Sequence, residues 1–270
     1  MKIKKALVTG GSTGIGLAIC EHLLAQGVEV FSISRNPSKL LENTKVTQIS
    51  LDLSETDLIS SFAENFISEH GSPDLLVNNA GYGAFYELAN FPEQEIVRQT
   101  AVLFTSPVLL CKAFAPAMKK MRNGVIVNVT SLATLYPLPF MPLYNSNKSA
   151  LSAFTHSMML EYDQYPNWID FRLGDILTGF NKSVPKQETN DQHPKMVLAW
   201  NQIEKQLNES PLPKVAVKQL FKFINKGTTG VIYGGSLFHS RILPFVYRLI
   251  SHSLLKRLLL KRYFMQRLFK

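Results

Sequence analysis

Short apolar runs alternate along the chain with longer stretches in which apolar residues recur every three or four positions. Runs of this length predict buried strands, and the longer spacing predicts helices that bury one face. The runs predict strands at residues 4–9, 28–34, 45–51, 74–77, 125–130, 168–173 and 230–233. The periodic stretches predict helices at residues 17–25, 54–70, 92–120, 143–163, 195–207 and 214–225, with Ser54 as a cap. This alternation favours a parallel sheet with right-handed crossovers, so we expect a doubly wound α/β fold with helices on both faces.

The first predicted strand runs into a glycine-rich turn, TGGSTGIG at residues 9–16, and a helix follows at once. Glycines in such a turn let the backbone approach a pyrophosphate, and the helix start supplies free N–H groups and the positive end of its dipole. Because these glycines stand between a strand and a helix, they predict a dinucleotide site in a single Rossmann-like domain.

The second predicted strand ends in Ser34 and Arg35. An acidic residue at this place bonds both hydroxyls of the adenosine ribose and favours NAD. A guanidinium instead suits the 2′-phosphate of NADP(H), which it can bond through two N–H groups. We therefore predict NADP(H) rather than NAD(H). The alternative is that Arg35 is an ordinary surface residue.

A second group of reactive residues stands where the strand at 125–130 ends and the helix at 143–163 begins. Tyr144 and Lys148 are four residues apart and so lie on one helix face, and the strand end can deliver Ser131 beside them. An ammonium next to a phenol favours phenolate, so we expect Lys148 to lower the pKa of Tyr144. Tyr144 would then be a proton donor near neutral pH. The spacing alone also fits a surface helix.

Together these motifs resemble the short-chain dehydrogenase/reductase family: TGxxxGxG at residues 9–16, NNAG at 78–81, Ser131, and YxxxK at 144–148. The resemblance covers about residues 4–180, and the stretch NNAGYGAFYEL is similar to members that act on steroids, retinoids and other lipophilic carbonyls. It implies that Tyr144 is the acid/base, that Ser131 bonds the substrate oxygen, and that Lys148 holds the nicotinamide ribose. It also implies cofactor contacts from Thr9, Gly10, Ser12, Gly14, Ile15, Gly16, Ser34, Arg35, Asp52, Leu53, Asn79, Ala80, Gly81, Tyr144, Lys148, Gly174 and Thr178.

The chain departs from the family pattern at two positions. Leu103 stands where the family usually has an asparagine that joins a water-mediated relay to the lysine. A leucine side chain can neither donate nor accept a hydrogen bond. We therefore expect one of three consequences: the relay is rebuilt from other groups, proton exchange is slow, or the activity is reduced. Leu173 replaces the usual proline before Gly174, which changes backbone stiffness more than chemistry.

Charge is distributed unevenly. The formal net charge is +9, yet no acidic residue follows Glu209, after which come twelve lysines and arginines. In the last 34 residues, 237–270, leucines recur at helical spacing with basic residues between them: Leu254, Leu255, Leu258, Leu259 and Leu268, with Lys256, Arg257, Lys261, Arg262 and Arg267. Such a basic amphipathic helix is typical of a membrane interface. The alternatives are a dimerisation helix or one packed on the sheet. Its apolar fraction is too high for a solvated nucleic-acid arm, so we expect no nucleic acid.

Composition narrows the remaining possibilities. With 46 % hydrophobic residues the chain is expected to fold, and Cys20 and Cys111 lie in apolar helical patterns as reduced core residues. The apolar run after the N-terminus is too short for a signal peptide, and no stretch reaches the roughly 18 continuous apolar residues of a spanning helix. The histidines lack the spacing of metal ligands, so we expect no metal site.

These patterns predict a catalytic domain at residues 1–236, with a substrate lid at about 178–213, and a basic tail at 237–270. Phe180, Val197 and Trp200 either line this lid or form a small core. A further apolar group near the presumed pocket favours a lipophilic substrate: Phe85, Tyr136, Phe140 and Met141.

We therefore predict an NADPH-dependent oxidoreductase that moves hydride between nicotinamide and a lipophilic ketone, aldehyde or secondary alcohol of lipid, steroid, retinoid or 3-oxoacyl type. The alternative is a membrane-associated NADP(H)-binding sensor or scaffold with weak or no catalysis. We expect a peripheral membrane protein on the cytoplasmic side. A homodimer is expected to pair through the helices at 92–120 and 143–163, as in the resembling family.

Overall fold

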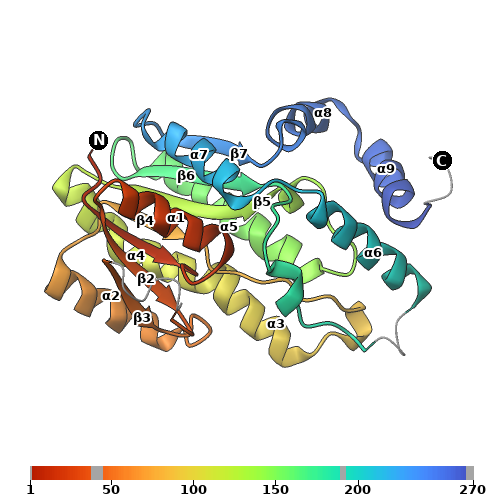
Figure 1. Ribbon diagram of the computed structural model, residues 1–270, viewed down its shortest axis with the longest axis horizontal. Helices are drawn as coiled ribbons and strands as arrows, with labels where there is room; N and C mark the ends of the chain where they lie inside the picture. The colour runs from red at the N-terminus through yellow and green to blue at the C-terminus, as the bar shows by residue number, and fades with distance from the viewer. Residues whose placement is uncertain (1, 38–44, 189–192, 266–270) are drawn as a thin grey trace.

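One parallel sheet organises the fold. The computed structural model describes residues 2–37, 45–188 and 193–265, and this part of the chain forms a seven-stranded sheet in the order β3-β2-β1-β4-β5-β6-β7 (Figure 1). Its strands are β1 (Lys5–Thr9), β2 (Glu29–Ser34), β3 (Val46–Ser50), β4 (Leu75–Asn78), β5 (Val125–Ser131), β6 (Asn167–Leu173) and β7 (Gly230–Gly234). All seven predicted strands are confirmed, each to within one residue at either end.

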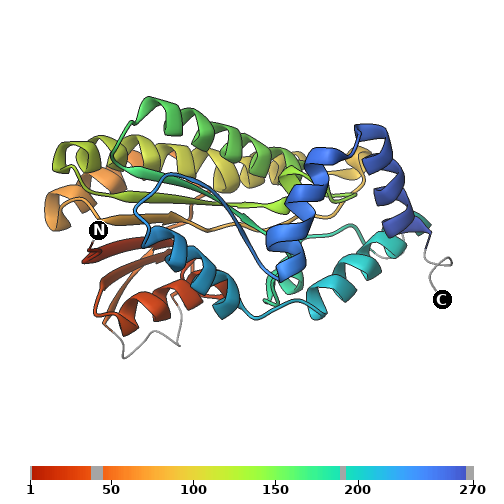
Figure 2. The same cartoon turned by 90° about the horizontal axis from the view of Figure 1, so that it is seen from above.

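Helices cover both faces of this sheet, as predicted. Their bounds are α1 (Gly14–Ala25), α2 (Asp57–His70), α3 (Glu93–Thr100), α4 (Ser106–Met121), α5 (Pro142–Glu161), α6 (Pro194–Asn208), α7 (Pro213–Ile224), α8 (Leu243–Leu249) and α9 (His252–Phe264). Viewed along the sheet, α4 and α5 lie on one side and α1 and α7 on the other (Figure 2). The arrangement is a three-layer α/β domain.

Successive residues of the central strands point to opposite faces and build two separate cores. In β1, Val8 joins the core under α1 and α7, whereas its neighbour Leu7 joins the core under α2 and α4. Val127 and Ile126 divide in the same way on β5. Because both faces are buried, these strands are continuously apolar, and this is why short apolar runs identified them. Cys20 and Cys111 are free and buried, and burial raises the pKa of each thiol to about 12.

The chain leaves β1 toward β2 on one side, and β4 lies on its other side. Strand order therefore reverses at β1, and in open α/β sheets ligands bind at the carboxyl ends of the strands beside such a reversal. The glycine-rich turn follows β1 and Asn79 follows β4, while Ser131 is the last residue of β5. The sheet thus brings three separated sequence motifs to one edge.

The prediction that Ser54 caps the second helix is wrong. Helix α2 begins at Asp57, and Ser54 instead donates through its N–H (2.9 Å) and its hydroxyl (2.8 Å) to Oδ1 of Asp52. A carboxylate two residues away offers serine a local turn that competes with helix capping.

The predicted helix at residues 92–120 is interrupted. A π-helical turn, η3 (Ala101–Thr105), separates α3 from α4. By length and composition the whole helix, Glu93–Met121, is apolar enough to cross a membrane, because its most apolar 18-residue window has a mean hydropathy of 1.6. The sequence analysis, which looked for a continuous apolar run, did not predict this. In the structure 56 % of that window is buried, and Leu110, Phe114 and Met118 pack under the sheet. This is the burial pattern of a core helix.

The C-terminal helices lie beyond the carboxyl ends of the strands (Figure 1), and α9 packs against α6. On α9 the expected separation of an apolar face from a basic face is wrong. Leu255 is buried, whereas Leu254 and Leu258 are exposed beside exposed Arg257, which shares their side of the helix. Arg267 and Leu268 of the predicted tail helix lie outside the described residues.

Candidate active site

A cavity of about 760 Å³ lies at the carboxyl ends of the strands. Its size falls within the range of small-molecule and cofactor sites. It is lined by every residue predicted for the site except Thr9 and Gly16: Gly10, Ser12, Gly14, Ile15, Ser34, Arg35, Asp52, Leu53, Asn79, Ala80, Gly81, Ser131, Tyr144, Lys148, Gly174 and Thr178. One chamber therefore joins the predicted cofactor residues to the predicted catalytic residues.

Thr9 and Gly16 act beneath the cavity rather than in its wall. The Thr9 hydroxyl accepts the N–H groups of Asn79 and Ala80, each at 3.0 Å, and so fastens the end of β4 to the end of β1. A Cβ on Gly16 would collide with the carbonyl oxygen of Gly10 and with the Asn79 amide. Thr9 thus fixes the strand ends beside the glycine-rich turn, and Gly16 lets the turn pack closely, while their predicted contact with cofactor stays a prediction.

The glycine-rich turn forms an open cradle above the start of α1. Thr13, which precedes the helix, makes no side-chain hydrogen bond to it, so the N–H groups of the first turn remain for another acceptor. Gly10 and Gly14 have φ values of 67° and 56°, which glycine adopts most readily. Helix N–H groups and a positive dipole end beneath an open turn fit the pyrophosphate of a nicotinamide dinucleotide.

The adenosine end of the cavity carries two guanidinium groups. Sequence analysis identified Arg35 at the rim, but it missed Arg98 on α3, which donates to Oδ2 of Asp52 at 3.1 Å. Burial alone would raise the pKa of Asp52, yet hydrogen bonds from Ser54 and the charges of Arg98 and Arg35 lower it. With the Asp52 charge matched by Arg98, Arg35 adds a second positive charge at this end, and the Glu95 carboxylate beside Tyr82 adds a second negative one. Only the folded structure brings Arg98 here, 46 residues along the chain from Asp52.

Ser131, Tyr144 and Lys148 meet in the middle of the cavity. The Ser131 oxygen accepts the N–H of Ala133 at 3.0 Å, which leaves its own proton to be donated elsewhere. Tyr144 and Lys148 stand one turn apart at the start of α5, as predicted. Lys148 is buried, with 4 % of its surface exposed, and its Nζ donates to the carbonyl oxygen of Val129 at 2.6 Å. An ammonium fixed by the backbone is pre-oriented toward the cavity.

The expected lowering of the Tyr144 pKa is wrong for this structure. Burial raises it most, a hydrogen bond with Ser131 lowers it, and the charge of Asp175 raises it further. Burial also lowers the pKa of Lys148 to about 8, which the charge of Asp170 opposes. Desolvation of both groups outweighs their mutual effect. Tyr144 is thus held as a neutral phenol at neutral pH, the form that donates a proton.

Leu103 lies in the π-helical turn η3 and is completely buried. A Cβ on Gly81 would meet the Leu103 side chain first and the Lys148 ammonium next, so these residues surround one point. The unusual leucine is therefore next to the catalytic lysine, in a helical irregularity of the kind often found at functional sites. The sequence motif placed Leu103 near Lys148, but nothing in the sequence predicted the π-helical turn that contains it.

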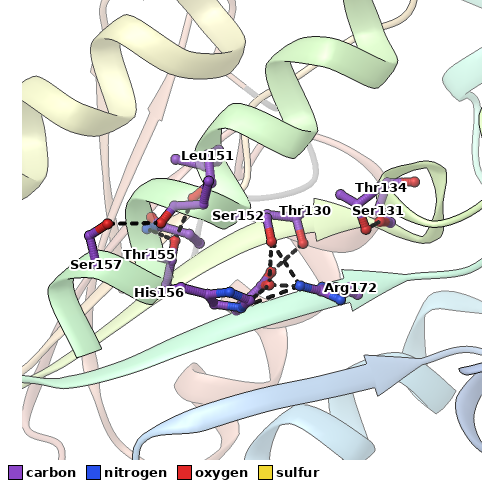
Figure 3. A network of polar contacts seen from close by, with 12 residues as sticks. Thr130, Ser131, Thr134, Leu151, Ser152, Thr155, His156, Ser157 and Arg172 are labelled. Carbon is purple, nitrogen blue, oxygen red and sulfur yellow. Dashed lines mark hydrogen bonds and ion pairs between the residues drawn. The ribbon is translucent and has the colours of Figure 1, made fainter. Parts of the chain in front are cut away.

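A buried polar network adjoins the catalytic residues on the side of α5. Asp170 of β6 is completely buried and accepts hydrogen bonds from Thr130 and from Ser152 (2.7 Å), while Nε of Arg172 lies 2.8 Å from its Oδ2. His156 closes the network at 3.2 Å from the same oxygen. Figure 3 shows Ser152 and His156 of α5, Thr130 of β5 and Arg172 of β6 converging on one point. Ser152 and His156 follow Lys148 along one face of the helix.

This network gives a testable pH dependence. The family resemblance implies that Lys148 acts in its charged form, which predominates below its pKa of about 8, so kcat/KM should be level below pH 8. Above that pH it should fall about tenfold per unit. Asp170→Asn removes the charge that raises the Lys148 pKa, so the decline should begin at lower pH. The measurement is the pH profile of kcat/KM for NADPH.

The matched control is Asp163→Asn, an exposed carboxylate whose loss should leave the profile unchanged. The readout is the position of the descending limb rather than its height, so partial loss of active protein does not obscure it. An Asp170→Asn profile that overlays the original would contradict the assigned effect of Asp170 on Lys148.

The substrate end of the cavity contains residues that sequence analysis missed. Apolar Ile203 and Leu207 of α6 and Leu243 of α8 line it, together with polar His239, Arg262 and Asp175. Arg262 donates to Oε1 of Gln206 at 2.7 Å, which ties α9 to α6. The stretch treated as an appended tail therefore contributes to the wall of the site. No local pattern marks these positions, because tertiary packing alone brings them to the cavity.

The predicted apolar pocket residues divide between cavity and core. Tyr136, Met141 and Phe180 line the cavity. Phe85 and Trp200 instead pack with Met141 in a small core that α6 helps to form, while Val197 is 39 % exposed. Of the residues for which both roles were open, Phe180 lines the cavity and Trp200 belongs to the small core. Among the residues that the structure describes, no three His, Cys, Asp or Glu side chains converge as they would around a metal ion.

Comparison with known proteins agrees with this geometry. The short chain dehydrogenase family model matches residues 4–189. A 3-ketodihydrosphingosine reductase of Bacteroides thetaiotaomicron is 33 % identical over 190 residues, which cover 69 % of this chain and 69 % of that protein. A short-chain dehydrogenase from Streptomyces avermitilis superposes with a TM-score of 0.79 at 22 % identity over 97 % of this chain and 96 % of that one. A metagenomic short-chain oxidoreductase in complex with NADP is 35 % identical, with a TM-score of 0.55 over 58 % of this chain and 76 % of that one.

Three other curated relatives are matched over only 55 to 58 % of their own length, and the family model ends before α6. Solved structures at this level of similarity hold NADP in some cases and NAD in others. The family model nonetheless spans well over half of the chain, including the glycine-rich turn and all three catalytic positions. The chain therefore belongs to the short-chain dehydrogenase/reductase family and is a nicotinamide-dependent oxidoreductase.

Proposed function

We propose that the protein is an NADPH-dependent reductase of a lipophilic ketone or aldehyde that carries a polar group close to its carbonyl. One observation carries the proposal: a single cavity joins the glycine-rich turn, the Ser131, Tyr144 and Lys148 group and an apolar wall with a polar end. The apolar wall suits a hydrocarbon chain, and Asp175, His239 and Arg262 suit a polar head group.

The residues have separate roles in the reduction. When bound, the nicotinamide supplies the hydride. The Ser131 hydroxyl donates to the carbonyl oxygen, and Tyr144 gives that oxygen its proton as negative charge develops on it. Lys148, fixed by Val129 and charged below pH 8, stabilises the phenolate that Tyr144 leaves behind. A raised Tyr144 pKa keeps the phenol protonated and favours the reductive direction.

The choice of NADPH rests on charge at the adenosine end. Arg35 stands at the rim, and Arg98 already offsets the charge of Asp52. A 2′-phosphate could bond the Arg35 guanidinium there, whereas the two hydroxyls of an NADH ribose would find the Asp52 carboxylate engaged by Arg98 and Ser54. This arrangement supports NADPH over NADH.

The names of two relatives narrow the substrate class. One is a 3-ketodihydrosphingosine reductase and another is a 3-oxoacyl-[acyl-carrier-protein] reductase of Chlamydia trachomatis, 28 % identical over 197 residues. Both names describe a 3-oxo compound. We extend this class, a chain with a carbonyl near a polar head, to the present protein. A homodimer through α4 and α5 is part of the same proposal.

The test is NADPH consumption by purified protein with detergent present, against 3-ketosphingoid, 3-oxoacyl, steroid and retinoid carbonyls, with NADH in parallel. We expect turnover of one 3-oxo class, faster with NADPH. Cofactor binding without turnover of any compound would contradict the proposal and support a cofactor-binding sensor.

Leu103 is the one observation that favours the sensor, and it yields a prediction. Leu103→Asn should change turnover by less than about threefold, because Lys148 already has a backbone acceptor in Val129 and a nearby carboxylate in Asp170. It should also destabilise the protein by about 1–3 kcal/mol, since it buries an amide where leucine was completely buried. Turnover and thermal unfolding are measured together, with Leu103→Met as the volume-matched control. A rise in turnover of more than about tenfold would show a degraded site.

A further inference from the structure

The outer face of one C-terminal helix is mostly apolar, with a single exposed arginine, Arg241, among the residues that the structure describes. The helix comprises a π-helical turn, η7 (Phe238–Ile242), and α8. Its exposed apolar residues recur at intervals that keep them on one side. They form what we term the outer stripe: Leu237, Phe238, Ile242, Phe245, Val246 and Leu249. Leu237 and Leu249, at its two ends, are each 70 % exposed.

The inner face of the same helix is well packed, so the outer stripe does not reflect a loose helix. His239 and Leu243 line the cavity. The Tyr136 hydroxyl donates to the carbonyl oxygen of Leu243, and Tyr136 and Tyr247 stack edge to face with ring centroids 5.5 Å apart. Elsewhere exposed apolar residues such as Leu88 and Val97 occur singly, as is normal for a protein surface. A continuous stripe on an anchored helix marks an interaction surface.

Helix α9 adds both leucines and positive charge to this surface. Leu254 and Leu258 are exposed on the side of α9 that carries Arg257, exposed Lys256 stands one turn before exposed Leu260, and Arg241 stands within the outer stripe. No acidic residue follows Glu209 in the sequence. Exposed apolar and basic side chains thus occur together on these helices, and none of their own residues is acidic. A partner must accept apolar contact and supply negative charge.

We propose that the outer stripe, with the exposed side of α9, docks the protein on an anionic lipid bilayer. The stripe enters the headgroup boundary, and Arg241, Lys256 and Arg257 meet anionic headgroups, each contributing about 1 kcal/mol near such a surface. A second copy of the chain fits less well, because a two-fold interface would bring these basic residues against themselves. Cytoplasmic leaflets carry the anionic lipids, which agrees with peripheral attachment on that side.

The surface also bears on substrate access, a consequence that rests on the proposed function. The helix whose outer stripe faces the bilayer forms part of the cavity wall with its inner face. A lipophilic substrate dissolved in the bilayer then has only this helix and its neighbours between it and Tyr144. The helix formed by η7 and α8 would therefore both contact the bilayer and border the route by which substrate enters the cavity.

Vesicle flotation of the full chain tests the docking directly and does not depend on turnover. Phosphatidylcholine vesicles with phosphatidylserine should bind the protein, and vesicles of phosphatidylcholine alone should bind it weakly. Phe245→Ser/Leu249→Ser should weaken binding more than about tenfold, because it removes two large apolar groups that would be buried. Lys256→Glu/Arg257→Glu should abolish the preference for phosphatidylserine.

The matched control is Leu88→Ser/Val97→Ser, two comparably exposed apolar residues far from the stripe, which should float like the original protein. NADPH binding by each variant confirms that it is folded. Equal flotation of Phe245→Ser/Leu249→Ser and the original would overturn the proposal. So would a dimer in sedimentation velocity that this double variant dissociates, without vesicle binding, because the stripe would then be an interface between copies.

Discussion

Tyr144→Phe is expected to lower turnover at least about a thousandfold and to leave NADPH binding unchanged. The substitution removes one oxygen from a side chain that lies within the cavity, so shape and packing are preserved. It removes the phenol proton assigned to the carbonyl oxygen, which burial and the charge of Asp175 hold on Tyr144 by raising its pKa. Steady-state turnover and NADPH fluorescence titration measure the two effects separately.

The control for Tyr144→Phe is Tyr162→Phe, a phenol that packs against Trp168 away from the cavity and should have near-original activity. Loss of NADPH binding in Tyr144→Phe would mean that the substitution disturbs the site rather than its chemistry. Retained turnover would refute the assignment of Tyr144 as the acid.

Arg35→Asp is expected to lower kcat/KM for NADPH about a hundredfold and to leave kcat/KM for NADH equal or higher. The change replaces a charge-assisted bond to the 2′-phosphate by repulsion, and it supplies the carboxylate that an NADH ribose prefers. The measurement is kcat/KM for both cofactors with one substrate. Because Arg98 still offsets Asp52, the remainder of the adenosine end should be unchanged.

Lys218→Asp makes the same change of charge at an exposed position on α7 and controls for net charge. It should leave the ratio of the two cofactors as it is. If Arg35→Asp reduces NADPH and NADH use equally, Arg35 is an ordinary surface residue and the cofactor preference lies elsewhere.

The sequence predicted those parts of the protein that depend on local pattern. The central strands follow from continuous apolar runs because both of their faces are buried, whereas edge strand β3 has no buried residue. The positions of Ser131, Tyr144 and Lys148 follow because a strand end and one helical turn fix them. The prediction that Ser54 caps α2 was wrong because the Ser54 hydroxyl donates to the neighbouring Asp52 carboxylate instead.

Features that depend on tertiary packing could not be predicted from the sequence. Arg98 reaches Asp52 only when α3 crosses the end of the sheet, and Arg262 reaches the cavity only because α9 packs on α6. The Tyr144 pKa was predicted in the wrong direction because the sequence shows the neighbouring lysine but not the burial of both groups. On α8 the outer stripe was overlooked because an apolar run of this length reads equally as core, and only its exposure distinguishes it.

The most direct test of the account follows the hydride itself. The purified enzyme is given a 3-oxo substrate and NADPH that carries deuterium at nicotinamide C4, on either face in separate samples, and the product alcohol is analysed by mass spectrometry. We predict one deuterium on the carbinol carbon with one of the two cofactors and none with the other, and no labelled product from Tyr144→Phe. Product without deuterium from both cofactors would contradict hydride transfer. An equal amount of labelled product from Tyr144→Phe and from the original protein in the same time would contradict proton donation by Tyr144.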